Sequence, residues 1–104
     1  MEGRLRLLSM WRSIVVRAAR AIKRAYPDAE IYVFGGAAED RLTIMSDIDL
    51  AVVLENPPGD SSELLANIWG LLEEEGIPLY YPLEVHILSR RDFERLKGSK
   101  VKLT

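Results

Sequence analysis

The sequence contains no cysteine, so the chain has neither a disulfide framework nor a thiolate metal site. It has no apolar run near the ~20 residues that a membrane span needs. The arginine-rich N-terminus lacks the compact apolar stretch and small-residue cleavage site of a signal peptide. No segment alternates basic and aromatic residues as a nucleic-acid platform would. We therefore expect a cytoplasmic protein that does not bind a membrane.

The composition present is that of a globular chain, with 48% hydrophobic and 29% charged residues. At 104 residues we expect a single domain, 1–104, with a modest core. The net charge is only −2, but residues 1–26 carry seven basic groups and one acid. Such an asymmetry indicates either a basic face for a protein or nucleic-acid partner, or a solvated helix face.

The stretch from Phe34 to Leu54 is the most informative part of the sequence. The apolar and aromatic run 31–34 ends at Gly35-Gly36, which predicts a strand followed by a turn that exposes its backbone. A second apolar run, 50–54, predicts a strand buried on both faces.

Asp47 and Asp49 lie at the start of this second strand. Because strand side chains alternate, the two carboxylates should leave the same face about 6–7 Å apart. Two negative charges held that close need a cation between them or protonation of one. Hard oxygen ligands at this spacing suit Mg²⁺, which fills its remaining positions with water and substrate phosphate.

The rest of the chain predicts three helices and one further strand. A helix is expected over about 5–26, a second from Asp60 or Ser61 to Gly76, and a third after Ser89. The strand is expected over 83–88, and the tail 99–104 is expected to be loosely ordered. This order predicts an α/β (α+β) fold with a small mixed sheet of three to four strands and helices packed mainly on one face.

Gly35-Gly36, followed by Ser46-Asp47-Ile48-Asp49-Leu50, resembles the Gly-Ser…Ser-Asp-x-Asp-Leu motif of the DNA-polymerase-beta-like nucleotidyltransferases. The size is similar to that of the minimal nucleotidyltransferases, which are often paired with helical HEPN-domain partners in toxin–antitoxin systems. The resemblance implies a nucleotidyltransferase-like fold and transfer of a nucleoside monophosphate, AMP from ATP being the expected case, to a hydroxyl acceptor. It also implies a HEPN-type partner. A homo-oligomer and a nucleic-acid partner remain open.

The resemblance also implies the residues of the site. A nucleoside triphosphate would be bound by Gly35, Gly36 and Ser46. Two Mg²⁺ ions, with Mn²⁺ as the alternative, would be held by three catalytic carboxylates, Asp47, Asp49 and Glu84.

The third carboxylate is open to two interpretations. Alternation puts Glu84 and His86 on the same face of the strand 83–88. Glu84 either lies beside the aspartates as the third metal ligand, which the resemblance favours, or at an exposed sheet edge. An alignment anchored on Ser89 would instead place His86 at the third-ligand position.

Three residues depart from the family pattern. Gly36 replaces the usual serine, while Glu39 and Asp40 stand where the family often has arginine and glycine. If these two acids face the triphosphate, they repel it. Arg41 is a candidate to supply the missing cation. The rival hypothesis is therefore a nucleotidyltransferase scaffold with weak or no catalysis, which serves as a protein-binding antitoxin.

Overall fold

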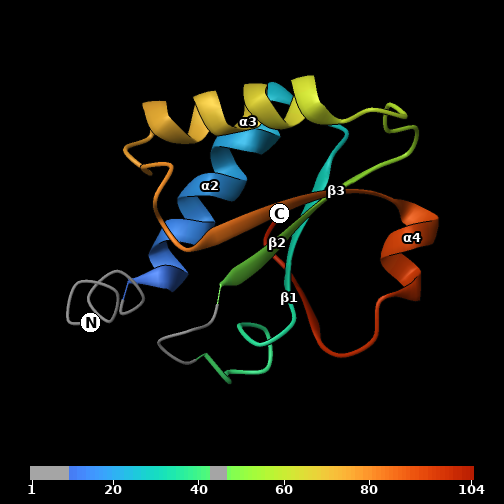
Figure 1. The fold of residues 1–104 in the computed structure, drawn as a ribbon. Helices are drawn as coiled ribbons and strands as arrows, with labels where there is room; N and C mark the ends of the chain where they lie inside the picture. The colour runs from blue at the N-terminus through green and yellow to red at the C-terminus, as the bar shows by residue number, and fades with distance from the viewer. Residues whose placement is uncertain (1–9, 43–46) are drawn as a thin grey trace.

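The computed structural model describes residues 10–42 and 47–104. Within these ranges the chain forms three helices and four strands (Figure 1). In chain order they are α2 (Trp11–Ala25), β1 (Glu30–Phe34), β2 (Ile48–Leu54), α3 (Ser62–Glu74), β3 (Leu83–Ser89), α4 (Arg90–Arg95) and β4 (Lys100–Lys102). No helix in these ranges has the length and apolar content that a membrane span requires.

The four strands form one mixed sheet in the order β3-β2-β1-β4. β1 pairs antiparallel with both β2 and β4, whereas β2 and β3 run parallel. A parallel pair needs a crossover connection, and α3 supplies it. The parallel register sets Asp49 opposite Glu84 and Ala51 opposite His86.

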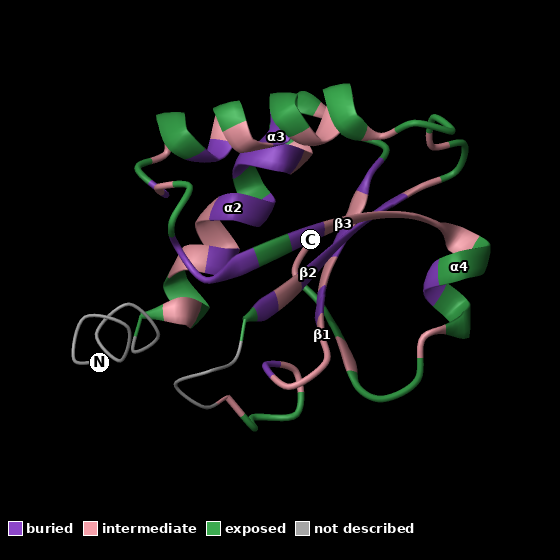
Figure 2. Ribbon diagram, in the orientation of Figure 1, coloured by how far each residue is buried: buried purple, intermediate pink, exposed green. Residues whose placement is uncertain are grey.

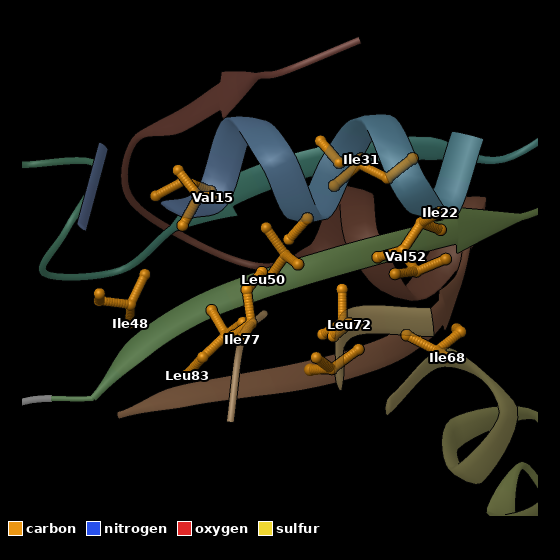
Figure 3. Close-up of a cluster of buried hydrophobic side chains, with 14 of the residues drawn as sticks. Val15, Ile22, Ile31, Ile48, Leu50, Val52, Ile68, Leu72, Ile77 and Leu83 are labelled. Atoms are coloured by element: carbon orange, nitrogen blue, oxygen red, sulfur yellow. The ribbon is translucent and has the colours of Figure 1, made fainter. Parts of the chain in front are cut away.

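One face of the sheet carries the main core, covered by α2 and α3 (Figures 1 and 2). Every second residue of the central strands points into it, in agreement with period-2 alternation. α2 contributes a stripe of small and branched residues, and its arginines lie outside that stripe. Figure 3 shows the side chains that meet there, among them Val15, Ile22, Ile31, Leu50, Val52, Ile68, Leu72 and Ile77.

The opposite face carries a smaller cluster built on α4. Phe93 packs there on Ala51 and Val53 of β2, and its ring lies 4.3 Å from that of Tyr32. The predicted start of this helix is confirmed, because the Asp92 amide donates to Ser89 Oγ at 3.1 Å. With two helices on one face and a short third on the other, the predicted fold class is confirmed.

The structure corrects the prediction for the tail. Residues 99–104 were expected to be loosely ordered, yet Lys100–Lys102 forms the fourth strand and pairs with β1. Pairing beyond the strand continues, because the Leu103 amide donates to the Ile31 carbonyl at 2.8 Å. Backbone hydrogen bonds to a buried strand order a short polar segment that has little apolar surface of its own.

The acidic C-terminal end of α3 is contacted by arginine side chains of α2. Arg24 pairs with the Glu75 carboxylate, and Arg17 Nη2 donates to the Glu75 carbonyl at 2.5 Å. Arginine at a helix C-terminus satisfies the exposed carbonyls and opposes the negative end of the dipole. Part of the basic surface of α2 is thus already used inside the molecule, while Glu73 and Glu74 are exposed.

Candidate functional site

Asp49 is the second residue of β2, which begins at Ile48. Its register partners are Phe34 of β1 and Glu84 of β3. Alternation turns Ile48 and Leu50 into the main core, so Asp49 points to the opposite face, the one that α4 partly covers. Because β2 and β3 are parallel and adjacent, Asp49 and Glu84 leave the same face side by side.

His86 completes a compact group with these two carboxylates. Its Nε2 lies 3.1 Å from Asp49 Oδ1 and 3.8 Å from Glu84 Oε1, and one ligand atom from each of the three residues lies within 4.8 Å of the others. Asp49 and His86 are half-buried, with 29% and 31% of the side chain exposed, whereas Glu84 is 59% exposed. Both alternatives for the third position, Glu84 and His86, therefore approach Asp49.

The orientation of the imidazole follows from its neighbours. The rings of His86 and Phe34 meet edge to face at 5.1 Å, across the strand that lies between them. The residue of β2 opposite His86 is Ala51, which is fully buried. A small side chain there leaves room for the two rings to approach over it. The ring is thereby turned toward Asp49.

The glycine turn closes over Asp49 from the other side. Gly35 has φ +70°, in the left-handed region that favours glycine, and a Cβ added to it would lie 2.7 Å from Asp49 Oδ2. At Gly36 an added Cβ would meet the Arg41 carbonyl at an ordinary 3.8 Å. Gly35 is thus required both for backbone conformation and for close approach to the carboxylate. The turn continues through Glu39, whose amide donates to the Gly35 carbonyl at 3.2 Å.

Ser46 and Asp47 are two further residues of the predicted site. Ser46 falls outside the described residues. Asp47 precedes β2, has an exposed side chain and is not part of the group formed by Asp49, Glu84 and His86. β2 begins at Ile48, so Asp47 lies just before the strand that contains Asp49. The roles of Ser46 and Asp47 stay predictions.

The two acids that depart from the family pattern are both paired. Asp40 accepts from Arg12 Nη2 at 2.9 Å, and Glu39 Oε1 accepts from Arg41 Nη2 at 2.9 Å. Glu39 Oε2 also accepts from the Ser99 amide at 3.4 Å. The hydrogen bond from Arg41, followed by that from Ser99, lowers the pKa of Glu39 below its ordinary value. Arg41 therefore offsets an acid of its own turn.

The donor set fits a divalent cation. Two carboxylates and one imidazole converge, and within the described residues no lysine or arginine lies at ion-pair distance from Asp49 or Glu84. Like charges on neighbouring strands repel each other, and a cation between them removes that cost. Oxygen and imidazole donors are ordinary ligands for divalent metals.

The resemblance favours Glu84 over His86 as the third ligand, and a single histidine in a strand is more often structural. The available signal was alternation, which put both residues on one face of β3. What could not be predicted was the parallel register with β2, which carries His86 to within 3.1 Å of Asp49.

The comparisons with known proteins define the class. The chain belongs to the nucleotidyltransferase domain family, whose model matches residues 15–102. Members of this family typically use a divalent metal ion and a nucleoside triphosphate.

Two solved structures are similar to the chain. One is a crystal structure of a candidate nucleotidyltransferase, 26% identical, with a TM-score of 0.54; the match covers 82% of this chain and 91% of that one. The other is a candidate nucleotidyltransferase from Sulfolobus solfataricus, 24% identical, with a TM-score of 0.49; the match covers 97% of this chain and 82% of that one. The first supports the fold described here. No curated protein matches the chain significantly.

Proposed function

We propose that the protein transfers a nucleoside monophosphate from a nucleoside triphosphate to a hydroxyl acceptor. The observation that carries this proposal is the group of Asp49, Glu84 and His86 beneath the Gly35 turn, in a chain of the nucleotidyltransferase domain family. In the reaction the acceptor oxygen bonds to the α-phosphorus while the bond from that phosphorus to the bridging oxygen of the β-phosphate breaks. Pyrophosphate leaves, and the proton of the hydroxyl goes to solvent.

The chain's own residues would position the reactants. Asp49 and Glu84 would offer carboxylate oxygens to divalent metal, with Asp47, just before β2, as a further ligand. When bound, such ions neutralise the charge of the triphosphate and of the transition state. Gly35, lacking a side chain, lets the backbone of the turn approach the Asp49 carboxylate closely, and its amide would contact a phosphate. Gly36 and Ser46 would complete the phosphate contacts.

The finer proposal is AMP transfer from ATP to a partner protein of the HEPN type, in which the present chain acts as antitoxin. It is supported by two exposed apolar residues, Leu79 and Tyr80, at 62% and 76% exposure, in the segment that leads into β3. The same segment borders the site, because the Ile48 amide donates to the Pro82 carbonyl at 2.9 Å. An apolar surface beside the site suits a protein acceptor.

Intact-mass spectrometry tests the proposal. The protein, alone and mixed with proteins that co-purify from its native host, is incubated with each nucleoside triphosphate and Mg²⁺ or Mn²⁺. A mass gain of one nucleoside monophosphate on any species, with pyrophosphate released, is expected with wild type and not with Asp49→Asn. Recovery of unmodified proteins under every condition would contradict the enzymatic proposal.

The second candidate function is a protein-binding scaffold that has lost catalysis. Gly36 supplies no hydroxyl to a phosphate, and Arg41 is engaged by Glu39. Asp47 lies outside the carboxylate–imidazole group. Co-purification of a partner without any nucleotide transfer would favour this function.

A further inference from the structure

The group beneath the glycine turn differs from a set of three carboxylates, since one of its donors is the nitrogen of His86. Asp49 and Glu84 are the other two donors on this face of the sheet. His86 Nε2 lies closer to Asp49 Oδ1 than to Glu84 Oε1. An imidazole in this place changes which metal ions the group can hold well. The inference below rests on the proposed function for the presence of a metal here.

We infer that His86 is a direct metal ligand through Nε2 and makes this a mixed nitrogen–oxygen site that selects Mn²⁺ over Mg²⁺. Mg²⁺ is a hard ion that takes oxygen ligands and keeps much of its water. First-row transition metals accept imidazole readily, and Mn²⁺ combines this tolerance with an affinity for carboxylates.

The separations between donors agree with such a site. Six ligands at about 2.1–2.2 Å from an ion lie about 3 Å from their neighbours on the octahedron and about 4.3 Å from the opposite ligand. The 3.1 Å between His86 Nε2 and Asp49 Oδ1 matches neighbouring positions, and 3.8 Å to Glu84 Oε1 lies between the two values. Glu84 is the most exposed of the three and is free to adjust its rotamer.

The ring is held where a ligand is needed. Phe34 packs against it edge to face, and Ala51 beneath it offers no bulk that would push it outward. Orientation by packing lowers the entropy cost of ligating an ion. The same 3.1 Å contact also fits a hydrogen bond from the imidazole to Asp49, in which His86 would only position the carboxylate. The experiment has to separate these two roles.

Mn²⁺ binding to the nucleotide-free full chain separates them without any activity measurement. Titration followed by the electron paramagnetic resonance signal of free Mn²⁺ gives the dissociation constant, and competition with Mg²⁺ gives the selectivity. Pulsed resonance on the bound ion detects a directly coordinated imidazole nitrogen. We expect that nitrogen signal in wild type, and its absence in His86→Gln.

The variants sharpen the distinction. Gln keeps an amide that can donate to Asp49 Oδ1 and an oxygen that can ligate a hard cation, so a positioning role survives in His86→Gln, but ligation by nitrogen does not. We expect His86→Gln to weaken Mn²⁺ binding by about 10-fold or more while changing Mg²⁺ binding little, so the selectivity ratio falls. Glu84→Gln, the matched control, should weaken both ions to a similar extent. Melting curves without metal confirm that each variant is folded.

Three results would overturn the inference: bound Mn²⁺ without a nitrogen coupling, an unchanged selectivity ratio in His86→Gln, or no Mn²⁺ binding at millimolar concentration. Nucleotide transfer is assayed separately with Mg²⁺ and with Mn²⁺ by mass spectrometry. Nucleotide transfer without nitrogen ligation would contradict the ligand role of His86 and leave the proposed function standing. Nitrogen ligation without nucleotide transfer under any condition would support the ligand role of His86 and contradict the proposed function.

Discussion

Two groups of charged residues lie on the same face of the sheet, and their chemistry differs. Around Glu30, Tyr32 donates its hydroxyl to Oε1 at 2.7 Å, Arg90 Nη2 donates to the same oxygen at 2.6 Å, and Lys102 lies 3.8 Å from Oε2. The hydrogen bonds from Tyr32 and Arg90 lower the pKa of Glu30 from 4.5 to about 2. This carboxylate is satisfied by its own chain.

Asp49, unlike Glu30, has another carboxylate as a neighbour. A second carboxylate, Glu84, is its register partner, and the imidazole Nε2 of His86 lies 3.1 Å from Asp49 Oδ1. The first group joins β1 to the start of α4 and to β4, and so holds the fold together. The second places two carboxylates and an imidazole side by side, and it is the group at which we propose that a cation binds. The comparison therefore contrasts a carboxylate satisfied by its own chain with carboxylates that we propose bind a metal.

The largest effect is expected when the second group is broken. Asp49→Asn keeps the size of the side chain and removes the charge. We expect transfer to fall by on the order of 10²–10³-fold or more, because charge stabilisation in the transition state is lost. Stability without metal should change little or rise slightly, since the repulsion from Glu84 is relieved. Rate measurements and thermal melts on the same preparations test both expectations.

Melts with metal and nucleotide provide the control for Asp49→Asn. A ligand at 100 times its dissociation constant stabilises the folded state by about 2.7 kcal/mol. Wild type should gain such an increment and the variant should lose it. If the variant instead unfolds several degrees earlier in metal-free buffer, Asp49 belongs with Glu30 as a structural acid, and the comparison fails.

The next largest effect is expected from alanine substitutions at two glycines. Gly35 and Gly98 both have positive φ, and an added Cβ would meet a carboxylate oxygen at 2.7 Å and 2.6 Å respectively. The partner of Gly35 is Asp49, a short side chain bound to His86, whereas the partner of Gly98 is the far end of Glu39. Alanine at either position should cost about 1–2 kcal/mol for the left-handed backbone.

Only Gly35→Ala should also disturb metal binding, because Asp49 must move to accept the new methyl group. Titration of Mn²⁺ into both variants measures this, with Gly98→Ala as the matched control for backbone strain. Equal loss of metal affinity in the two variants, or none in Gly35→Ala, would show that the turn does not set the position of the carboxylate.

Much of the fold could be predicted because it is encoded in local periodicity. The alternation in 83–88 and the stripe in α2 both follow from neighbouring residues. β4 could not be predicted: three residues with two lysines carry no strand pattern, and their pairing with β1 depends on residues about 70 positions away. Ala25 continues the spacing of three and four residues along the stripe of α2, yet it is exposed where that helix ends.

The candidate site could likewise be predicted only in part. Asp49, Glu84 and the glycine turn could be predicted from motif spacing and alternation. The approach of His86 to Asp49 depends on the register of two parallel strands joined by a helix, which local patterns do not determine. The Arg90 pair with Glu30, which spans 60 positions, is likewise visible only in the fold.

A smaller effect is expected when the satisfied group is broken. Glu30→Gln should cost about 1 kcal/mol at neutral pH, because the charge-assisted hydrogen bond from Arg90 is lost and the group is partly exposed. The pKa of Glu30 is lower in the folded state than its ordinary 4.5, so the unfolded chain binds this proton more readily. Its contribution is therefore complete above pH 4.5 and is lost as the pH falls toward 2.

Melts of wild type and Glu30→Gln across that range test this expectation. Their difference in stability should shrink as the pH falls, and metal binding at Asp49 should be unchanged in both. Glu94→Gln, an exposed acid of α4, controls for the loss of one charge. A difference that stays constant between pH 4.5 and 2 would mean that Tyr32 and Arg90 do not stabilise the ionised form of Glu30.

The smallest effect is expected at Glu39 and Asp40, the acids that depart from the family pattern. Both are already paired, Glu39 with Arg41 and Asp40 with Arg12, so neither presents an unopposed charge to a triphosphate. The Arg12–Asp40 pair is 69% and 83% exposed and should contribute little. Glycine at 40 also relieves a positive φ of 57°. We therefore expect Glu39→Arg with Asp40→Gly to change nucleotide affinity by less than about threefold at physiological salt.

Calorimetry at low and high salt, with Asp40→Gly alone as control, measures this change in nucleotide affinity. Binding that tightens tenfold and weakens again with salt would mean that the two acids repel the phosphates after all, and would place them with Asp49 instead of Glu30.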